Sequence, residues 1–315
     1  MQLFKQEINW NFLKHANVAM VLSAILILGS ITSLAIQGLN YGLDFTGGTK
    51  IDVAYVEDTN LTNIRAQLVD AGYGEAVVQN FGTSKDVTIR LGIVAKEGLT
   101  KDQIGNNILD ILKSDGSEVV LKNLGFVSAT IGEELTEQGI LAIVVMLICI
   151  MLYVTVRFEW KFSVGAVAAL AHDVILTVGV FSFLQLDFDL TVLAAVLAVI
   201  GYSLNDTIVV YDRIRENFLK LRKAEAEMVI NKSINQTFAR TLITSGTTLF
   251  VLIALFVVGG QLIHGFATAL LIGILVGTYS SIYVASFLAL KLGVCKEDLM
   301  PTEIAKEGAD QDALM

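Results

Sequence analysis

Residues 190–210 read LTVLAAVLAVIGYSLNDTIVV, an apolar stretch that carries Asn205 and Asp206 close to its end. About 20 apolar residues are enough to cross a bilayer as an α-helix, so this stretch is predicted to span a membrane. A carboxylate in such a helix costs roughly 3 kcal/mol on insertion scales, and it usually faces a protein interior or a water path. Asp206 is therefore the first candidate functional residue.

The composition is that of an integral membrane protein. Of the 315 residues, 54% are hydrophobic and only 17% are charged, which is too apolar for an ordinary soluble domain. The net charge of -9, without a polybasic tract, argues against nucleic acid as a partner, and the apolar composition makes the lipid bilayer the expected surroundings. Cys149 and Cys295 have no second thiol or histidine cluster nearby, so neither a disulfide nor a metal site is expected. No glycine-rich nucleotide loop or nucleophile constellation occurs, so we expect no enzyme activity and no cofactor.

Six apolar runs are predicted to span the membrane, one before and five after a more polar region: residues 16–36, 140–156, 163–184, 190–211, 242–258 and 266–290. Before them, residues 1–15 mix aromatic and basic side chains, which favours a short interfacial helix over residues 3–14, with a mobile leader as the alternative. A signal peptide is also conceivable, because Ser33-Leu34-Ala35 offers small residues at a suitable spacing. The first run is longer than the apolar part of a signal peptide, so we expect an uncleaved first span.

Residues 37–139 are numerous enough for one small domain and alternate between strand and helix patterns. Asn60 and Thr100 are candidate N-caps of its two helices. The predicted order is strand, helix, strand, strand, helix, strand, over residues 50–56, 61–71, 75–81, 86–91, 101–113 and 118–129. This βαββαβ order is typical of the α+β ferredoxin-like fold.

Lys and Arg residues near the ends of the spans predict the orientation. Residues 212–240, the predicted basic loop, carry seven of them and residues 157–162 carry two, whereas residues 185–189 and 259–265 carry none. By the positive-inside rule, both termini are cytoplasmic, including the acidic tail 291–315, and the domain is outside. In a bacterium with two membranes, this corresponds to a multi-pass inner-membrane protein with a periplasmic domain.

Asp206, Asp173 and Arg240 could line one polar seam. Asp206 lies about four residues from the cytoplasmic end of its span, Arg240 begins the fifth span at a comparable depth, and Asp173 lies about ten residues inside the third span. An aspartate that exchanges a proton beside a stabilising arginine is the minimal part of a proton relay. Plainer interpretations remain: Arg240 as a headgroup anchor, Asp173 as a hydrogen-bond partner between helices, and Asp206 as a member of a structural ion pair.

Several motifs carry a resemblance to a known family: residues 42–48 (GLDFTGG), 171–173 (AHD), 201–217 (GYSLNDTIVVYDRIREN), 239–241 (ART) and 244–246 (TSG). Nearly the whole chain resembles the SecF family of protein-export membrane subunits, within the resistance-nodulation-division (RND) superfamily. The resemblance implies a polytopic α-helical membrane protein with six transmembrane helices, one half of an RND-type unit. It also implies one α+β ferredoxin-like periplasmic domain between helices 1 and 2.

Partners and a function also follow from the resemblance. SecD would complete the pseudo-symmetric unit, and the SecYEG channel, YajC and unfolded preprotein would be further partners. Proton flow into the cytoplasm would drive late, ATP-independent translocation and release of the preprotein. Asp206 matches the membrane-embedded aspartate of the family and Arg240 its arginine. We add Asn205, beside Asp206, and Asp173, from its depth and polarity, to the candidate proton relay.

The motif GLDFTGG at residues 42–48 is predicted to contain a hinge between the first span and the outer domain, over residues 43–49. Its candidate residues are Gly42, Asp44, Gly47 and Gly48, because glycine frees the backbone. Two other functions remain open: half of a proton-coupled RND-type efflux transporter, which would need a second six-helix half, and a non-energised scaffold of the export channel. Copurified partners would separate export from efflux, and proton flux would separate a motor from a scaffold.

Overall fold

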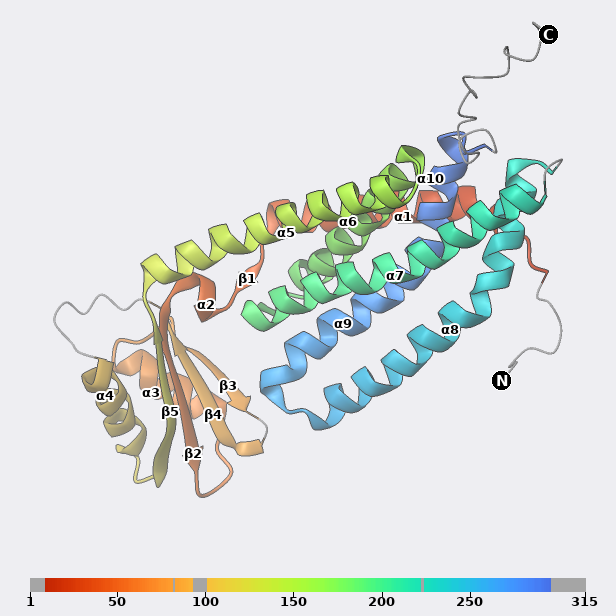
Figure 1. The fold of residues 1–315 in the computed structure, drawn as a ribbon. Coiled ribbons are helices and arrows are strands. Elements are labelled where there is room, and N and C mark those ends of the chain that lie inside the picture. Colours follow the sequence, from red (N-terminus) through yellow and green to blue (C-terminus); the bar gives the residue numbers. More distant parts are fainter. Residues whose placement is uncertain (1–8, 82, 93–100, 222–223, 296–315) are drawn as a thin grey trace, which may run out of the picture.

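The computed structural model describes residues 9–81, 83–92, 101–221 and 224–295. A bundle of long helices carries a small sheet domain at one end, and α10 lies at the opposite end (Figure 1). Within the described residues, six helices are long and apolar enough to cross a membrane, which confirms a polytopic helical membrane protein. The long helices are α1 (Ala16–Ile36), α5 (Ala129–Arg157), α6 (Trp160–Phe183), α7 (Leu190–Lys220), α8 (Ala226–Val258) and α9 (Gln261–Ser280), which the π-helical turn η2 (Ser281–Ala285) continues into α10 (Ser286–Lys291).

Three helices extend well beyond the apolar runs that predict them. α5 begins 11 residues before residue 140, α7 continues 9 residues beyond residue 211, and α8 begins 16 residues before residue 242. Hydropathy detects only the part of a helix that lies in lipid, whereas its backbone hydrogen bonds continue into water. The predicted basic loop 212–240 is therefore mostly helical, because it contains the end of α7 and the start of α8.

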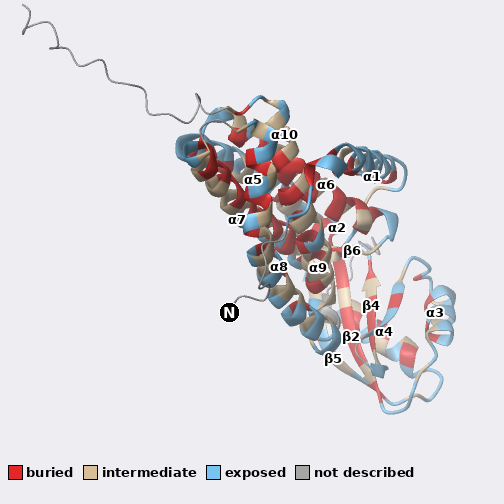
Figure 2. Cartoon of the chain, turned by 90° about the vertical axis from the view of Figure 1, so that its right-hand side faces the viewer, coloured by how far each residue is buried: buried red, intermediate tan, exposed pale blue. Residues whose placement is uncertain are grey.

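The centre of the bundle is formed by α6, α7 and α9. In the apolar segments of these three helices, 50–56% of the residues are buried, against 11–17% in α1, α5 and α8. Figure 2 shows this division, with buried residues concentrated on the inner helices and exposed residues along α1 and α8. The outer faces are rich in Val, Ile and Leu, as expected for surfaces that contact lipid or another membrane subunit.

Glycines allow the closest contacts between the helices. A Cβ atom on Gly273 of α9 would lie 2.1 Å from the Val199 side chain of α7, and one on Gly179 of α6 would lie 2.2 Å from the Ser30 side chain of α1. These helices can approach so closely only because a side chain is missing. Gly246 of α8 differs, since no described atom beyond its own surroundings in the helix lies within 4 Å of its Cβ position.

The sheet domain consists of β2 (Gly48–Tyr55), α3 (Leu61–Asp70), β3 (Val77–Phe81), β4 (Thr83–Leu91), α4 (Lys101–Lys113) and β5 (Val119–Val127). Its four strands form one antiparallel sheet in the order β3-β4-β2-β5. Alternate strand residues, such as Ile51, Val53 and Ile89, are buried in a core shared with α3 and α4. The predicted order of elements is present, and the Asn60 side chain caps α3 at 2.9 Å. The other predicted cap, Thr100, lies outside the described residues.

The chain before α1 differs from the predicted interfacial helix. Residues 1–8 lie outside the described residues, residues 9–12 are not helical, and Leu13–His15 form a 3-10 turn, η1. The backbone of residues 9–12 instead exchanges hydrogen bonds of 2.8–3.1 Å with the side-chain amides of Asn231 and Asn235 on α8. Because these amides satisfy the backbone groups, the segment does not need helical hydrogen bonds.

Candidate functional site

Asp206 lies inside the helix bundle, on the buried side of α7. It follows Leu190, where α7 begins at the domain end of the bundle, by 16 residues, which corresponds to about 24 Å along the helix. Asp206 is 3% exposed, and its Oδ2 atom is buried without a hydrogen-bond partner among the described residues. The neighbouring Thr207 Oγ1 has no partner there either. A buried polar atom without a partner costs about 1–3 kcal/mol, so this part of α7 is maintained at the expense of stability.

Asp173 on α6 is fully buried and surrounded by hydrogen-bond donors. Its Oδ2 atom accepts hydrogen bonds from Ser203 of α7 at 2.5 Å and from Ser280 of α9 at 2.7 Å. Its Oδ1 atom lies 2.9 Å from Nδ1 of His172. Asp173 is thus a hydrogen-bond junction between the three central helices.

His172 extends this network to α1. Its Nε2 atom lies 3.2 Å from Ser23 Oγ, which lies 3.0 Å from the Tyr279 hydroxyl. The Tyr279 hydroxyl donates to the Ala19 carbonyl at 2.6 Å. Such a network holds the helices in one arrangement, because each group that lost its partner would remain buried and unsatisfied.

Ser203 lies on α7 close to both aspartates in position along the bundle. It lies three residues before Asp206, so both side chains share one face of α7, a turn apart. Because Ser203 also donates to Asp173, Asp173 packs against α7 one helical turn before Asp206. The sequence did not single out Ser203 or Ser280, since serines in apolar helices commonly bond to their own preceding turn. The spacing of Ser203 and Asp206 is the signal that could have found the first of them.

Arg240 and Asn205, unlike the two aspartates, are not buried. Both residues are exposed on the surface of the bundle. Arg240 is near enough to Asp206 to act on it electrostatically, but no ion pair within 4.0 Å joins them in the part of the chain that the structure describes. Lipid offers no hydrogen-bond partner to an exposed asparagine within a span, whereas an arginine near the end of a span can also reach the headgroups.

The π-helical turn η2 follows Ser280 directly. A π turn shifts the hydrogen-bond register of a helix and occurs frequently at functional sites. Tyr211 of α7 donates to the Ala285 carbonyl at 3.1 Å, and Ser286 donates to the Ser281 carbonyl at 3.2 Å. The irregular part of this helix therefore lies beside the Asp173 network and is satisfied by hydroxyl groups.

The motif at residues 42–48 forms a second candidate region. Leu43–Thr46 form α2, a single helical turn, and Gly47 and Gly48 follow with φ angles of 71° and 135°. Glycine adopts such angles readily, and at Gly48 a Cβ atom would also lie 2.3 Å from the Leu91 carbonyl oxygen. Within the predicted hinge, the unusual backbone is thus concentrated at these two glycines.

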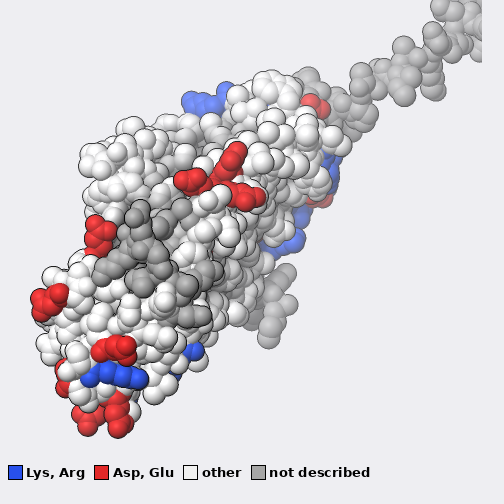
Figure 3. All heavy atoms as spheres, turned by 90° about the vertical axis from the view of Figure 1, so that its left-hand side faces the viewer, with Lys and Arg blue, Asp and Glu red and all other residues white. Residues whose placement is uncertain are grey.

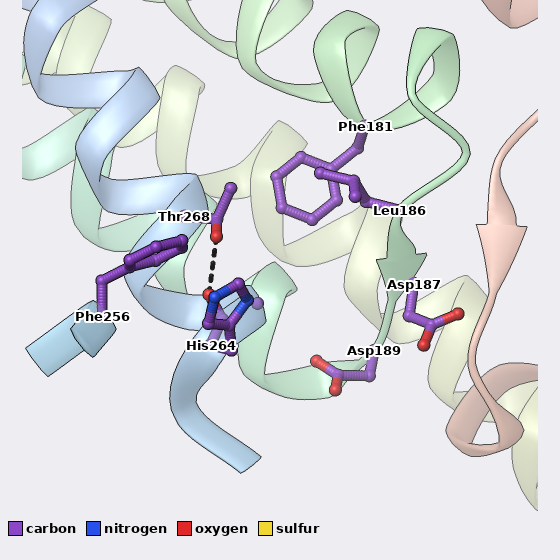
Figure 4. Close-up of a pocket in the computed structure, with 8 residues that line it drawn as sticks. Phe181, Leu186, Asp187, Asp189, Phe256, His264 and Thr268 are labelled. Carbon is purple, nitrogen blue, oxygen red and sulfur yellow. Dashed lines mark hydrogen bonds between the residues drawn. The ribbon is translucent and has the colours of Figure 1, made fainter. Parts of the chain in front are cut away.

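A pocket of about 390 Å³ lies at the domain end, between α8, α9 and the turn that joins α6 to α7 (Figure 4). Asp187 and Asp189 line it from that turn, and the His264 ring packs on Phe256 with the centroids 3.9 Å apart. Both carboxylates are engaged, since Arg90 donates to Asp187 and Asp189 caps α7. Among the described residues, no group of three or more His, Cys, Asp or Glu side chains is placed to hold a metal ion.

Family comparisons match both candidate regions. The family described as protein export membrane protein SecD/SecF, C-terminal, matches residues 107–294, and the SecD/SecF GG motif matches residues 32–58. The first match contains Asp173 and Asp206, and the second contains the motif that forms α2.

Curated relatives are similar along nearly the whole chain. The chain is 55% identical over 314 residues to a protein translocase subunit SecF from Vibrio alginolyticus, which covers 99% of both chains. It is 42% identical over 308 residues to a protein translocase subunit SecF from Escherichia coli O157:H7, which covers 97% of this chain and 95% of that relative.

Two solved structures have the same arrangement of elements. SecDF from Thermus thermophilus, described as a translocon-associated membrane protein, superposes with a TM-score of 0.81 and 36% identity. SecDF in a super-membrane-facing form superposes with a TM-score of 0.70 and 35% identity. Each match covers 92% of this chain but 39% of the SecDF chain, so this chain spans less than half of the SecDF length.

Proposed function

Because this chain belongs to the SecF family of protein translocase subunits, we propose that it acts with SecD to couple inward proton flow to preprotein translocation. The coupled step is late and ATP-independent, and it releases the preprotein outside the membrane. The observation that supports this most directly is the buried Oδ2 atom of Asp206, which has no partner among the described residues. Such an oxygen can take up a proton without breaking a hydrogen bond, and its charge changes inside the helix bundle.

The proposed relay contains Asp206, Asp173, Arg240 and Asn205. Ser203 provides the physical link between the two aspartates, because it bonds to Asp173 and lies one turn from Asp206. Arg240 and Asn205 are exposed in this chain, as expected of groups that a partner subunit covers. SecD packed against this face would complete the relay and supply its remaining acidic group.

We place the protein in the bacterial inner membrane, with both termini cytoplasmic and the sheet domain in the periplasm. The basic residues at the end of α7 and the start of α8 lie far from the domain along the bundle, as the positive-inside rule requires. On the face seen in Figure 3, at the domain end, most charged side chains are acidic. The strand order β3-β4-β2-β5 with two crossing helices supports a ferredoxin-like domain.

The partners in this proposal are SecD, the SecYEG channel, YajC and unfolded preprotein. The protein is not an enzyme and uses no cofactor, because the transported protons supply the driving force. Movement of the outer domain about Gly47 and Gly48 then acts on the emerging chain, since these residues carry the positive φ angles between α2 and β2.

The test is Asp206→Asn in a complex with intact SecD and the channel in vesicles. We expect normal assembly, with proton flux and proton-dependent release both lost, because asparagine keeps the shape but cannot carry the proton. Asp212→Asn is the matched control on the same helix: Asp212 forms a surface ion pair with Arg157, and this variant should behave as wild type. Normal release in Asp206→Asn would refute the relay, and a wild-type complex without proton flux would favour the scaffold.

A further inference from the structure

The turn between α6 and α7 is joined to the segment that leads from α1 into the outer domain. β1 (Asn40–Tyr41) pairs in parallel with β6 (Asp187–Phe188), and the next N–H, of Gly42, donates to a β6 carbonyl at 2.8 Å. The Asn40 side chain also donates to Asp187 at 2.9 Å, across 147 residues of sequence. Backbone and side-chain hydrogen bonds therefore hold the two segments together.

Asp44 extends this join to the first turn of α7. Its Oδ2 atom accepts the backbone N–H of Leu190, the first residue of α7, at 3.1 Å. Asp189 caps the same turn from its own segment and accepts the Val192 N–H at 2.9 Å. The first N–H groups of a helix have no partner within the helix and favour negative charge, so both carboxylates stabilise this end. One of the two belongs to the segment that enters the outer domain.

Aromatic packing fixes α2 in the same place. The Phe45 ring stacks on Phe188 with centroids 5.9 Å apart, and Phe188 meets Phe181 of α6 edge to face. On its other side, α5 approaches so closely that a Cβ atom on Gly132 would lie 2.4 Å from the Phe45 carbonyl oxygen. A shift of α2 relative to the turn would therefore expose buried aromatic surface.

We propose that Asp44 is a positioning residue that couples α7 to the outer domain. The inference rests on the proposed function and adds one step to it, in which the charge change at Asp206 displaces α7. The hydrogen bond of Asp44 to Leu190 and the pairing of β1 with β6 make α2 move together with the start of α7. Gly47 alone separates α2 from β2, and β2 is a central strand of the sheet, so the displacement of α7 reaches the middle of the domain.

The test compares Asp44→Ala with Asp44→Asn, in the complex with SecD and the channel, and measures proton flux and preprotein release in the same vesicles. With Asp44→Ala, proton flux stays near the wild-type rate while release per proton falls by about tenfold, the factor expected for one hydrogen bond to a charged group. Asn retains an oxygen that accepts the Leu190 N–H and keeps most of the coupling. Asp70→Ala, at an exposed acid on α3, is the control and leaves both rates unchanged.

Hydrogen exchange of residues 186–193 gives a readout that does not depend on proton coupling. Asp44→Ala speeds exchange at the start of α7, and Asp44→Asn does so much less. Unchanged exchange in Asp44→Ala overturns the inference, as does wild-type release per proton or an equal loss of flux and release. A wild-type complex without proton flux refutes the proposed function instead, whatever the exchange result.

Discussion

Asp206 and Asp173 are two buried aspartates of the helix bundle with different hydrogen-bond surroundings. Asp173 accepts from two serine hydroxyls and lies 2.9 Å from a histidine ring nitrogen, whereas Asp206 has Ser245 of α8 as its neighbour and its Oδ2 atom has no partner among the described residues. A carboxylate held by several donors loses some of those hydrogen bonds when it binds a proton, and an oxygen without partners loses nothing. Asp206 is therefore suited to exchange, and Asp173 is suited to orient Ser203 and Ser280.

Asp173→Ala would leave the Ser203 hydroxyl without its acceptor inside the bundle, whereas the Ser280 hydroxyl would keep the Gly277 carbonyl at 3.2 Å. We expect the free energy of unfolding to fall by about 3 kcal/mol, as when one partner of a buried polar pair is removed. Thermal unfolding of the purified protein in mild detergent measures this loss. Asp173→Asn keeps an oxygen acceptor, so we expect it to fold. Because asparagine cannot exchange a proton, the proposed relay, which includes Asp173, predicts that this variant supports little release. A stable Asn variant with normal release would restrict Asp173 to a structural role.

Tyr55 in β2 places its hydroxyl in the domain core without a hydrogen-bond partner among the described residues. Tyr55→Phe should therefore raise the free energy of unfolding by about 1 kcal/mol, because it removes a buried unsatisfied group. Thermal unfolding followed by near-ultraviolet circular dichroism measures the gain. Tyr41→Phe, at an exposed ring, is the control and should change little.

The same hydroxyl predicts a pH dependence. Burial raises the pKa of Tyr55 to about 12, and the Asp115 carboxylate adds to the shift. Since this pKa lies above the ordinary value of 10.0, the folded state holds the proton more tightly than the unfolded chain. Below pH 10.0 the ionisation of Tyr55 does not change the free energy of unfolding. As the pH rises from 10.0 toward 12, the unfolded chain loses this proton first, and the free energy of unfolding of the wild type falls. The advantage of Tyr55→Phe should therefore grow above pH 10.0, and a constant difference would contradict the assignment.

The three central helices meet through small and polar residues. A Cβ atom on Gly277 of α9 would lie 3.1 Å from the Ser203 side chain and 3.5 Å from Asp173 Oδ2. The missing side chain therefore makes room for the hydrogen bond between Ser203 and Asp173. The small residues that let α6, α7 and α9 pack closely therefore also leave space for the hydrogen bonds between these helices.

Gly273→Ala tests this packing. The added methyl group would overlap Val199, so α9 and α7 must separate, and we expect a loss of about 1–3 kcal/mol, as for other overpacked sites. Gly246→Ala is the matched control in a helix of the same bundle, because its Cβ position is open and alanine favours helix. Unfolding temperatures of the two variants in one detergent give the comparison. Equal stability would contradict the close approach of α7 and α9.

The sheet domain is joined to the helix bundle by two chain connections and by one ion pair. Arg90 at the end of β4 donates to Asp187 in the α6–α7 turn at 2.7 Å, and the two side chains are 17% and 35% exposed. Asp187 also accepts from Asn40, so the contact reaches the join between β1 and β6. This ion pair crosses the predicted pivot at Gly47 and Gly48 and favours the domain position seen in Figure 1.

Arg90→Glu should loosen the domain, because it places a second negative charge beside Asp187. We expect faster hydrogen exchange in residues 86–92 and 186–189, with a coupling energy for the pair of about 1 kcal/mol. The double variant Arg90→Glu with Asp187→Arg should recover part of the protection, although it loses the contact with Asn40. Exchange in Arg90→Glu equal to that of the wild type would show that the ion pair does not hold the domain.

The sequence by itself determined the membrane class, six spans, the order of strands and helices in the domain, and Asp206 as the anomalous residue. These features depend on local patterns: apolar runs long enough for a bilayer, period-two and helical spacing, and a carboxylate within an apolar helix. The Asn60 cap could be predicted for the same reason, since a cap acts within one turn.

Only the tertiary structure decided how far the helices extend, that the backbone of residues 9–12 bonds to Asn231 and Asn235, and that Ser203 of α7 bonds to Asp173 of α6. It also placed Asp44 at the start of α7. The hydrogen bonds among these features join segments that are far apart in the chain, and the length of a helix beyond its apolar run depends on what its ends pack against. A hydrogen bond between distant segments leaves no periodic trace in a sequence, because its energy depends on the distance between two atoms and not on their spacing along the chain.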